Sequence, residues 1–454
     1  MARLEFPAGF EGSENLPRTK RTVQNMWNNL EGRMIARPGI QLISTTAGGV
    51  ARGSFEWNGS LYVVVSQELR KITNLETGAS SLIGTIAGPE PIESAVGFND
   101  AVIIVKGGAS YTLSKTDTLT DTSGEDNFEP FIDVAHLNDR FIYVPSSGLT
   151  VKFSDVGAAG TIGGLSFFNP QVLPDISNGV FTFRNDLYIC GTDSIEIFRD
   201  TGASPNPFVR LEGGGIQNGL IGGILEYNNT FLFLGREKGQ DFGIYGLNGG
   251  EAPKVSNERI DLILSTYTLL ELSEVIPGRF KWRGYDIATF TLRRDSFGFF
   301  RGNWFLLDTV IEGISRPWSA GFITQFQGEY FTAFSDRFGK FANINTDYGE
   351  PITRRLGTAI EQPDTDYFRL QSIELGISQG FDVDQGTLAL FLSEDNVIFS
   401  EPIYQVLGEI GEYDKKLIWN YAGGLGNYRG FLAFEFYTRE DIVASDDYIV
   451  LEID

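Results

Sequence analysis

The sequence predicts an all-β chain in which a β-propeller of about six or seven blades is followed by a C-terminal β-sandwich-like domain. Three observations lead to this prediction. One hairpin motif recurs along the chain, its copies stand about one propeller blade apart, and alternating strand patterns continue after the repeat ends.

The recurring unit is an apolar or aromatic strand, a two-residue polar turn and a second apolar strand, as in Phe55 to Val64. Asn-Gly, Asn-Asp and Asn-Asn pairs tolerate the positive φ that such turns require. Turn residues of the copies are Asn58, Asn99, Asn138, Asn185 and Asn228, with looser copies around Gly284 and Gly328. The first five stand roughly 40 to 47 residues apart, whereas a sandwich does not repeat one hairpin at that period. The longer interval from Asn228 to Gly284 indicates an insertion.

Loss of the repeat at both ends divides the chain into three expected units. Residues 1–50 form an N-terminal docking segment, with a short helix expected near Thr22 to Leu30. Residues 51–350 form the propeller. Residues 351–454 form a C-terminal β domain, because strand patterns such as Phe368 to Leu375 alternate there with period two.

The charge balance is strongly acidic, with 59 Asp and Glu against 36 Lys and Arg and a formal net charge of −23. Tight binding to nucleic acid requires clustered cations, so this balance disfavours it. A conduit through which DNA slides without adhering is compatible with the same charge. We expect neither a signal peptide nor a transmembrane helix, and synthesis in the cytoplasm.

Few residues suggest catalysis. His136 is the only histidine, which excludes multi-histidine metal sites, and Cys190 is the only cysteine, which excludes an intrachain disulfide. Both are expected to be packed structural residues. We predict no catalytic residue, no metal and no cofactor, and the chain is expected not to be an enzyme. The many carboxylates leave a glycosidase pair open by count alone.

Several short motifs occur in a fixed order along the chain. They are an Arg-Pro-Gly near the start, a Thr-Gly with a following Phe, an Asn-Gly, a Ser within a Val-Ser-Asn run, a Gly-Glu-Tyr and a Trp. Their positions are Arg37, Pro38, Gly39, Thr201, Gly202, Phe208, Asn218, Gly219, Ser256, Gly411, Glu412, Tyr413 and Trp419. Pro-Gly and Thr-Gly are turn chemistry, so these positions are interpreted as structural.

In this order the motifs resemble the tail nozzle, or tail hub, proteins of short-tailed bacteriophages, the family of the phage P22 packaged-DNA stabilisation protein. Lys254, Asn257 and Asp261 depart from the family pattern. The resemblance implies a propeller subunit of the virion that forms a homohexameric ring below the portal and its adaptor. Such a ring extends the DNA channel and retains packaged DNA until ejection.

The resemblance also implies partners: portal–adaptor proteins, tail fibre or spike and tail needle proteins, and double-stranded DNA passing without sequence-specific binding. It implies assembly in the host cytoplasm and no membrane insertion. Two alternatives stay open. A glycan-recognising receptor-binding propeller would show an aromatic-lined pocket, and a propeller glycosidase would show two carboxylates facing each other in a central cleft.

Overall fold

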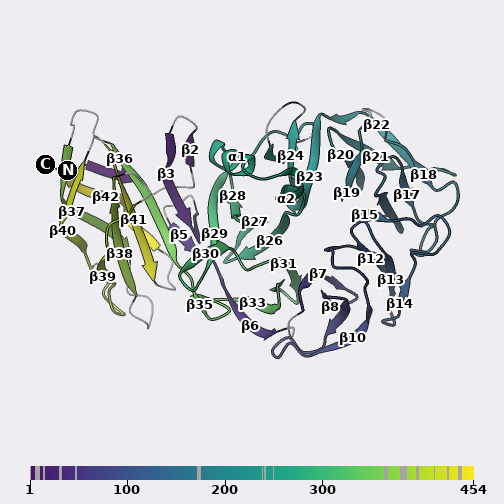
Figure 1. Ribbon diagram of the computed structural model, residues 1–454, viewed down its shortest axis with the longest axis horizontal. Coiled ribbons are helices and arrows are strands. Elements are labelled where there is room, and N and C mark those ends of the chain that lie inside the picture. The colour runs from purple at the N-terminus through teal and green to yellow at the C-terminus, as the bar shows by residue number, and fades with distance from the viewer. Residues whose placement is uncertain are drawn as a thin grey trace.

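Strands make up most of the fold, and two short helices interrupt them. The computed structural model describes residues 2–5, 11–13, 16–29, 33–45, 49–170, 175–237, 239, 242–248, 250–361, 367–378, 386–394, 398–413, 415–426, 429–437 and 442–453. In Figure 1 a propeller of small sheets occupies the centre and right, and a second β body lies at the left.

Blades 1 to 4 are four-stranded antiparallel sheets whose strands pair in chain order. Blade 1 contains β7 (Ala51–Trp57), β8 (Ser60–Val65), β9 (Glu68–Ile72) and β10 (Ser80–Thr85). Blade 2 contains β11 (Ile92–Val96), β12 (Asp100–Val105), β13 (Ser110–Ser114) and β14 (Leu119–Asp121). Blade 3 contains β15 (Phe131–Leu137), β16 (Arg140–Pro145), β17 (Val151–Phe153) and β18 (Phe167–Phe168). Blade 4 contains β19 (Ser177–Phe183), β20 (Asp186–Gly191), β21 (Ile195–Asp200) and β22 (Phe208–Ile216).

The remaining blades recruit other elements. Blade 5 has three strands, β23 (Asn218–Tyr227), β24 (Thr230–Glu237) and β25 (Phe242–Gly246), followed by α1 (Glu258–Ser265) and α2 (Leu269–Ser273). Blade 6 contains β26 (Ile276–Trp282), β27 (Tyr285–Thr291), β28 (Ser296–Phe300) and β29 (Asn303–Ile311), with β30 (Ile314–Pro317) paired to the end of β29. Blade 7 contains β31 (Phe322–Phe326), β32 (Glu329–Phe334) and β33 (Arg337–Ala342).

The innermost strands form a closed circle. They contact one another in the order β7, β11, β15, β19, β23, β26 and β31, and β31 contacts β7 again. The propeller therefore has seven blades, which confirms the predicted fold class. Each of the seven predicted hairpins is the first hairpin of one blade. Turn residues Asn58, Asn138, Asn185 and Asn228 have the positive φ that the turn chemistry predicts.

The long interval between Asn228 and Gly284 contains the two helices. Ile260, Leu264 and Leu272 are buried in a core shared with strands of blades 5 and 6. The Asn257 side chain caps α1 by accepting a hydrogen bond from the Ile260 amide at 3.0 Å. The insertion is thus packed against the propeller and takes the position after β25 that a fourth strand holds in other blades.

The N-terminal part of the chain closes the propeller. Strand β6 (Gly39–Thr45) pairs antiparallel with β33 and gives blade 7 its fourth strand. On its other side β6 meets β34 (Thr346–Asp347), which pairs with β35 (Glu350–Pro351). Ile40 is fully buried there. Residues 39–45 therefore belong to the propeller sheets, although they lie within the first fifty residues.

The second body consists of two facing sheets. One continues from blade 6 through β3 (Leu16–Gln24) into β36 (Arg354–Glu361), β41 (Arg429–Tyr437), β38 (Thr387–Ser393) and β39 (Ile403–Val406), with β2 (Glu11–Ser13) beside β3. The other contains β4 (Met26–Asn28), β5 (Arg33–Ala36), β42 (Ile442–Ile453), β37 (Tyr367–Ser378) and β40 (Leu417–Gly426), with β1 (Ala2–Glu5) beside β42. Trp27, Ile373, Leu388, Trp419 and Phe434 share the core of this sandwich.

The prediction of a short helix near Thr22 to Leu30 is wrong, because the described residues there form the end of β3 and all of β4. Gln24 pairs with Leu306 of blade 6 on one side and with Arg355 of β36 on the other. Asn25 then takes a positive φ of 58° and separates the two strands. These distant partners override the local helical tendency.

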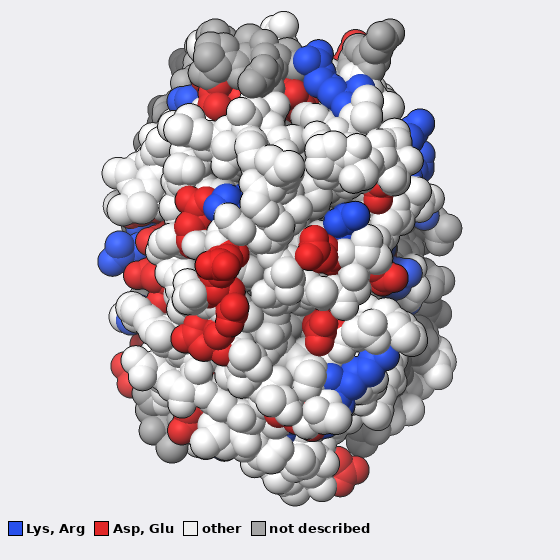
Figure 2. Space-filling model, turned by 90° about the vertical axis from the view of Figure 1, so that its right-hand side faces the viewer, with Lys and Arg blue, Asp and Glu red and all other residues white. Residues whose placement is uncertain are grey.

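Charged side chains are distributed unevenly over the surface. Figure 2 shows the outer edges of blades 2 to 4, where Asp and Glu gather in one patch, Lys and Arg are scattered, and a broad uncharged area runs between them. Among the described residues, no helix is both long and apolar enough to span a membrane.

Candidate functional site

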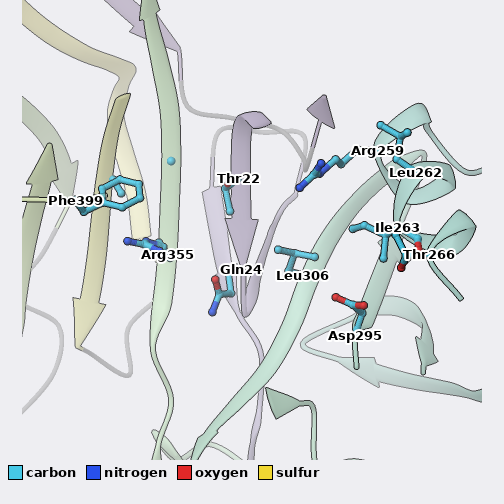
Figure 3. A pocket seen from close by; sticks show the side chains of 12 residues that line it. Thr22, Gln24, Arg259, Leu262, Ile263, Thr266, Asp295, Leu306, Arg355 and Phe399 are labelled. Atoms are coloured by element: carbon cyan, nitrogen blue, oxygen red, sulfur yellow. Dashed lines mark hydrogen bonds between the residues drawn. The ribbon is translucent and has the colours of Figure 1, made fainter. Parts of the chain in front are cut away.

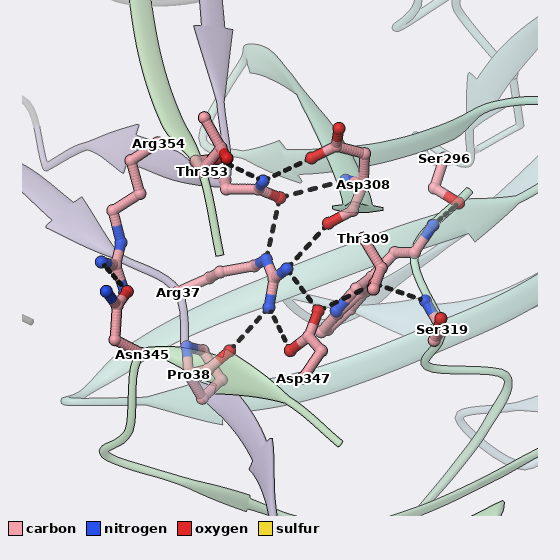
Figure 4. A network of polar contacts seen from close by, with 12 residues as sticks. Arg37, Pro38, Ser296, Asp308, Thr309, Ser319, Asn345, Asp347, Thr353 and Arg354 are labelled. Carbon is pink, nitrogen blue, oxygen red and sulfur yellow. Dashed lines mark hydrogen bonds and ion pairs between the residues drawn. The ribbon is translucent and has the colours of Figure 1, made fainter. Parts of the chain in front are cut away.

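Arg37 lies at the centre of a fully buried polar network where the propeller meets the sandwich (Figure 4). Its guanidinium forms a bidentate ion pair with Asp347, with Nη2–Oδ2 at 2.6 Å and Nη1–Oδ1 at 2.9 Å, and both side chains have no exposed surface. It also donates to the Asn25 Oδ1 at 2.8 Å and to the Asp308 carbonyl at 2.8 Å. The Trp318 ring lies 5.1 Å from the guanidinium carbon.

The network extends beyond Arg37. Asn25 Nδ2 donates to Asp308 Oδ1 at 2.5 Å and to the Thr353 carbonyl at 2.7 Å. Thr309 Oγ1 donates to Asp347 Oδ2 at 2.8 Å. The network therefore ties the N-terminal strands, blade 6 and the chain entering the sandwich to one point.

Pro38 and Gly39 continue the Arg37 motif into β6. The Pro38 carbonyl accepts a hydrogen bond from Arg37 Nη1 at 2.9 Å. A Cβ on Gly39 would lie 2.5 Å from the carbonyl oxygens of both Ile344 and Thr346, so only glycine fits. The motif thus fixes the strand that closes the propeller.

Thr201, Gly202 and Phe208 shape the turn between β21 and β22. Thr201 Oγ1 donates to the Pro207 carbonyl at 2.9 Å, and Gly202 has a positive φ of 68°. Phe208 is buried, with its ring centroid 5.3 Å from that of Phe153.

Asn218, Gly219 and Ser256 lie in and beside blade 5. Asn218 and Gly219 begin β23, and a Cβ on Gly219 would lie 1.8 Å from the Thr192 carbonyl oxygen. Ser256 Oγ accepts from the Ile244 amide at 3.0 Å and donates to Asp261 at 2.5 Å, which links β25 to α1.

Gly411, Glu412 and Tyr413 follow β39 at the surface of the sandwich, and Gly411 has a positive φ of 93°. Glu412 Oε2 accepts from the Glu409 amide at 3.1 Å. Trp419 is buried and donates from Nε1 to the Ile403 carbonyl at 3.0 Å. The motif positions are therefore spread over the propeller and the sandwich and do not meet in one pocket.

A cleft of about 650 Å³ opens where α1 faces the sheet that joins the two bodies (Figure 3). Arg259 of α1 and Arg355 of β36 lie on its two sides, with Thr22 and Gln24 of β3 between them. Arg355 Nε lies 3.3 Å from Glu435 Oε1, and the Arg355 guanidinium carbon lies 4.7 Å from the Phe399 ring centroid. Protein groups therefore already balance the charge of Arg355. The cleft has mixed chemistry and no carboxylate pair among its lining residues.

Two carboxylates on innermost strands were not singled out by the sequence. Glu93 of β11 is exposed at the surface, yet desolvation together with the Asp133 charge raises its pKa to about 8, with Lys106 opposing the shift. Desolvation raises the pKa of Asp133 on β15 to about 6, although the amides of Val134 and Val180 each donate to it at 2.8 Å.

The two residues with nucleophilic or basic chemistry are packed. His136 packs against Phe141 with ring centroids 4.9 Å apart and the ring planes tilted by 57°, and desolvation lowers its pKa. Cys190 is fully buried and desolvation raises the pKa of its thiol, which keeps it protonated and unreactive. Within the described part of the chain, no three His, Cys, Asp or Glu side chains gather so as to hold a metal ion.

Replacing Arg37 with Met is expected to lower the free energy of unfolding by about 3–5 kcal/mol, because Asp347 would keep a buried, unpaired charge. Urea unfolding measures the loss. The double variant Arg37→Met, Asp347→Leu should recover part of it. Arg199→Met, which removes the exposed partner of Asp186, serves as the control and should change little. A loss no larger for Arg37→Met than for this control would contradict the assigned role.

Glu93→Gln is expected to stabilise the protein increasingly as the pH rises from about 5 to about 8. In that window the unfolded chain ionises Glu93 while the folded chain keeps it protonated, because the folded pKa is raised from 4.5 to about 8. Wild-type stability therefore falls with rising pH, and the Gln variant lacks this loss. Melting temperatures across the window measure the difference, with Glu76→Gln in an exposed turn as the control. A difference in melting temperature between the variant and the wild type that does not change with pH would refute the raised pKa of Glu93.

Comparison with solved structures gives only distant likenesses. The computationally designed Ika8 protein is 10% identical with a TM-score of 0.41, covering 66% of this chain and 98% of that chain. Virginiamycin B lyase from Staphylococcus aureus is 10% identical with a TM-score of 0.41, covering 67% and 98%. Exo-beta-1,3-galactanase from Phanerochaete chrysosporium is 9% identical with a TM-score of 0.30, covering 80% and 95%. Likeness at this level carries no argument about function.

Comparison of sequences is more informative. No curated protein matches the chain. A family profile described as bacteriophage P22 Gp10, beta-propeller, matches residues 11–339, which is most of the chain. This range starts at β2, contains blades 1 to 6 and ends within β33 of blade 7. The chain therefore belongs to the bacteriophage P22 Gp10 β-propeller family.

Proposed function

We propose that the chain is a subunit of a sixfold nozzle ring in a short phage tail. The family identifies a structural protein of bacteriophages. The ring would attach below the portal and adaptor, extend the DNA channel and retain packaged DNA until ejection. It would assemble in the host cytoplasm and contact tail fibre or spike and tail needle proteins.

The observation that supports this role best is the continuous sheet between the two bodies. Blade 6 passes into the sandwich through β3, and the buried Arg37 network fixes the same junction. A subunit in a conduit wall is loaded from inside and must transmit that load without hinging. A shared sheet and a shared core resist hinging better than a flexible linker.

Charge favours passage of DNA over adsorption. One chain carries a formal charge of −23, and six copies would carry about −138, six times that value. A lumen that shares this excess would repel phosphates, so DNA would slide without being held by the wall.

A second function, glycoside hydrolysis, has one observation in its favour. Glu93 and Asp133 are carboxyl groups with raised pKa values on neighbouring inner strands. Asp133 accepts hydrogen bonds from two backbone amides, which suits a structural role better than proton transfer to a sugar. We therefore favour the structural role over glycoside hydrolysis. The remaining alternative, a glycan receptor-binding propeller, has no residue in the cleft beyond Phe399 that offers an aromatic platform.

Electron cryo-microscopy of the chain mixed with the portal–adaptor complex of its phage tests the proposal. We expect a sixfold ring docked coaxially below the adaptor, with the N-terminal strands or the sandwich facing it. A chain that stays monomeric, or forms trimers that ignore the complex, would refute the nozzle function. Glycan-binding and hydrolysis assays would then decide between the alternatives.

A further inference from the structure

The first hairpin turn of blade 1 differs chemically from the equivalent turns of blades 3 and 5. The two turn residues are Asn58-Gly59 in blade 1, Asn138-Asp139 in blade 3 and Asn228-Asn229 in blade 5. Each pair follows the last residue of one strand and precedes the first residue of the next, as Trp57 and Ser60 show in blade 1. The first turn residue has a φ of 48°, 48° and 47° in the three blades. Turns of nearly the same geometry therefore differ in the residue that follows asparagine.

The residue after an asparagine controls how readily its side-chain amide is lost. The backbone nitrogen of that residue attacks the asparagine Cγ and forms a new C–N bond. The attacking nitrogen gives up its proton, the amide nitrogen takes up one proton, and ammonia leaves from a five-membered succinimide. Water then opens the succinimide at either carbonyl and gives aspartate or isoaspartate. A side chain on the second residue crowds the attacking nitrogen, whereas glycine has no side chain.

The Asn58-Gly59 turn is open to this reaction. Both residues are exposed, so water can reach the turn. Both lie outside the hydrogen-bonded ladder of β7 and β8, which ends at the pair of Trp57 and Ser60. A Cβ built on Gly59 would meet no described atom within 4 Å. The Gly59 nitrogen is therefore neither crowded nor held in a strand.

Other Asn-Gly pairs of the chain are held by the fold. In Asn178-Gly179 the Asn178 Nδ2 donates to the carbonyls of Leu220 and Ile221 at 3.1 and 3.3 Å. In Asn218-Gly219 the asparagine is only 7% exposed, and both residues pair with β24. A fourth pair, Asn248-Gly249, includes a residue outside the described ranges and takes no part in the comparison. Pairing in a strand keeps the backbone extended and so opposes closure of the five-membered ring.

We propose that Asn58 is a deamidation site of the folded chain, through a succinimide formed with the Gly59 nitrogen. The proposal does not depend on the nozzle function. Isoaspartate at position 58 would add one carbon to the backbone of a two-residue turn. The neighbouring Trp57 is buried and donates from Nε1 to the Gly97 carbonyl at 2.9 Å, which links blade 1 to blade 2. Isoaspartate therefore loosens this contact between the blades.

Peptide mass spectrometry of the full-length chain after incubation in mildly alkaline buffer tests the site. The tryptic peptide from Gly53 to Arg70 contains Asn58 as its only asparagine. In the folded protein we expect Asn58 to convert at least about tenfold faster than Asn138 and Asn228, a difference of about 1.4 kcal/mol in activation free energy. Asn58 converting no faster than these two asparagines would overturn the proposal.

A comparison with the chain unfolded in urea isolates the effect of the fold. In urea Asn58, Asn178 and Asn218 should convert at similar rates, because each is followed by glycine and none is held in a strand. In the folded protein only Asn58 of these three should keep its rate. Conversion of Asn178 or Asn218 in the folded protein as fast as that of Asn58 would contradict the protection assigned to the strands.

Gly59→Asp is the matched variant, because it gives blade 1 the turn that blade 3 already has. Asp139 has a φ of 58°, so the same hairpin accepts aspartate at this position. The variant should fold, and the fast conversion of Asn58 should disappear. After equal incubation the wild type should melt at a lower temperature than the variant, in proportion to its isoaspartate content. Fast conversion that persists in the variant would refute the role of Gly59, and equal melting temperatures would refute the loosened blade contact.

Discussion

The buried pair of Arg37 and Asp347 is the interaction on which the arrangement of the chain depends. Removing both charges from water is costly, and the pair is tolerated because each charge is satisfied by close hydrogen bonds. Such a pair adds little stability compared with apolar residues of equal size. Its effect is to permit one arrangement of Asn25, Arg37 and Asp308 and to penalise shifted alternatives.

The Arg37–Asp347 pair determines where the N-terminal strands and the segment after blade 7 lie. Arg37 lies between β5 in the sandwich and β6 in the propeller, so fixing its side chain fixes both strands. Asp347 lies opposite Ile40, which places the carboxylate beside the strand that completes blade 7. Propeller closure and attachment of the sandwich are therefore set by the same few residues. A rigid two-part subunit follows from this arrangement.

The propeller could be predicted because its signals are local. A polar pair such as Asn58-Gly59 or Asn228-Asn229 fixes a turn whatever lies elsewhere in the chain. Such turns at blade-length spacing predicted about six or seven blades, and the structure has seven. The Thr22 to Leu30 segment was misjudged because its partners, Leu306 and Arg355, lie far along the chain. The role of Asp347 could not be predicted from the sequence either. Its ion-pair partner, Arg37, lies 310 residues away along the chain, so nothing near Asp347 marks it as buried. Glu93 and Asp133 were missed for a similar reason: only the packing of blade 2 against blade 3 brings β11 and β15 together.

Hydrogen exchange over a series of denaturant concentrations tests most directly whether propeller and sandwich form one unit. The protected amides of β8 in blade 1 and of β38 in the sandwich report the free energy of opening of each body. We expect the opening free energies reported by β8 and β38 to converge on the same value, because the shared sheet and the Arg37 network prevent either body from unfolding alone. A clearly lower opening free energy for β38, with β8 still protected, would show two independent domains and contradict it.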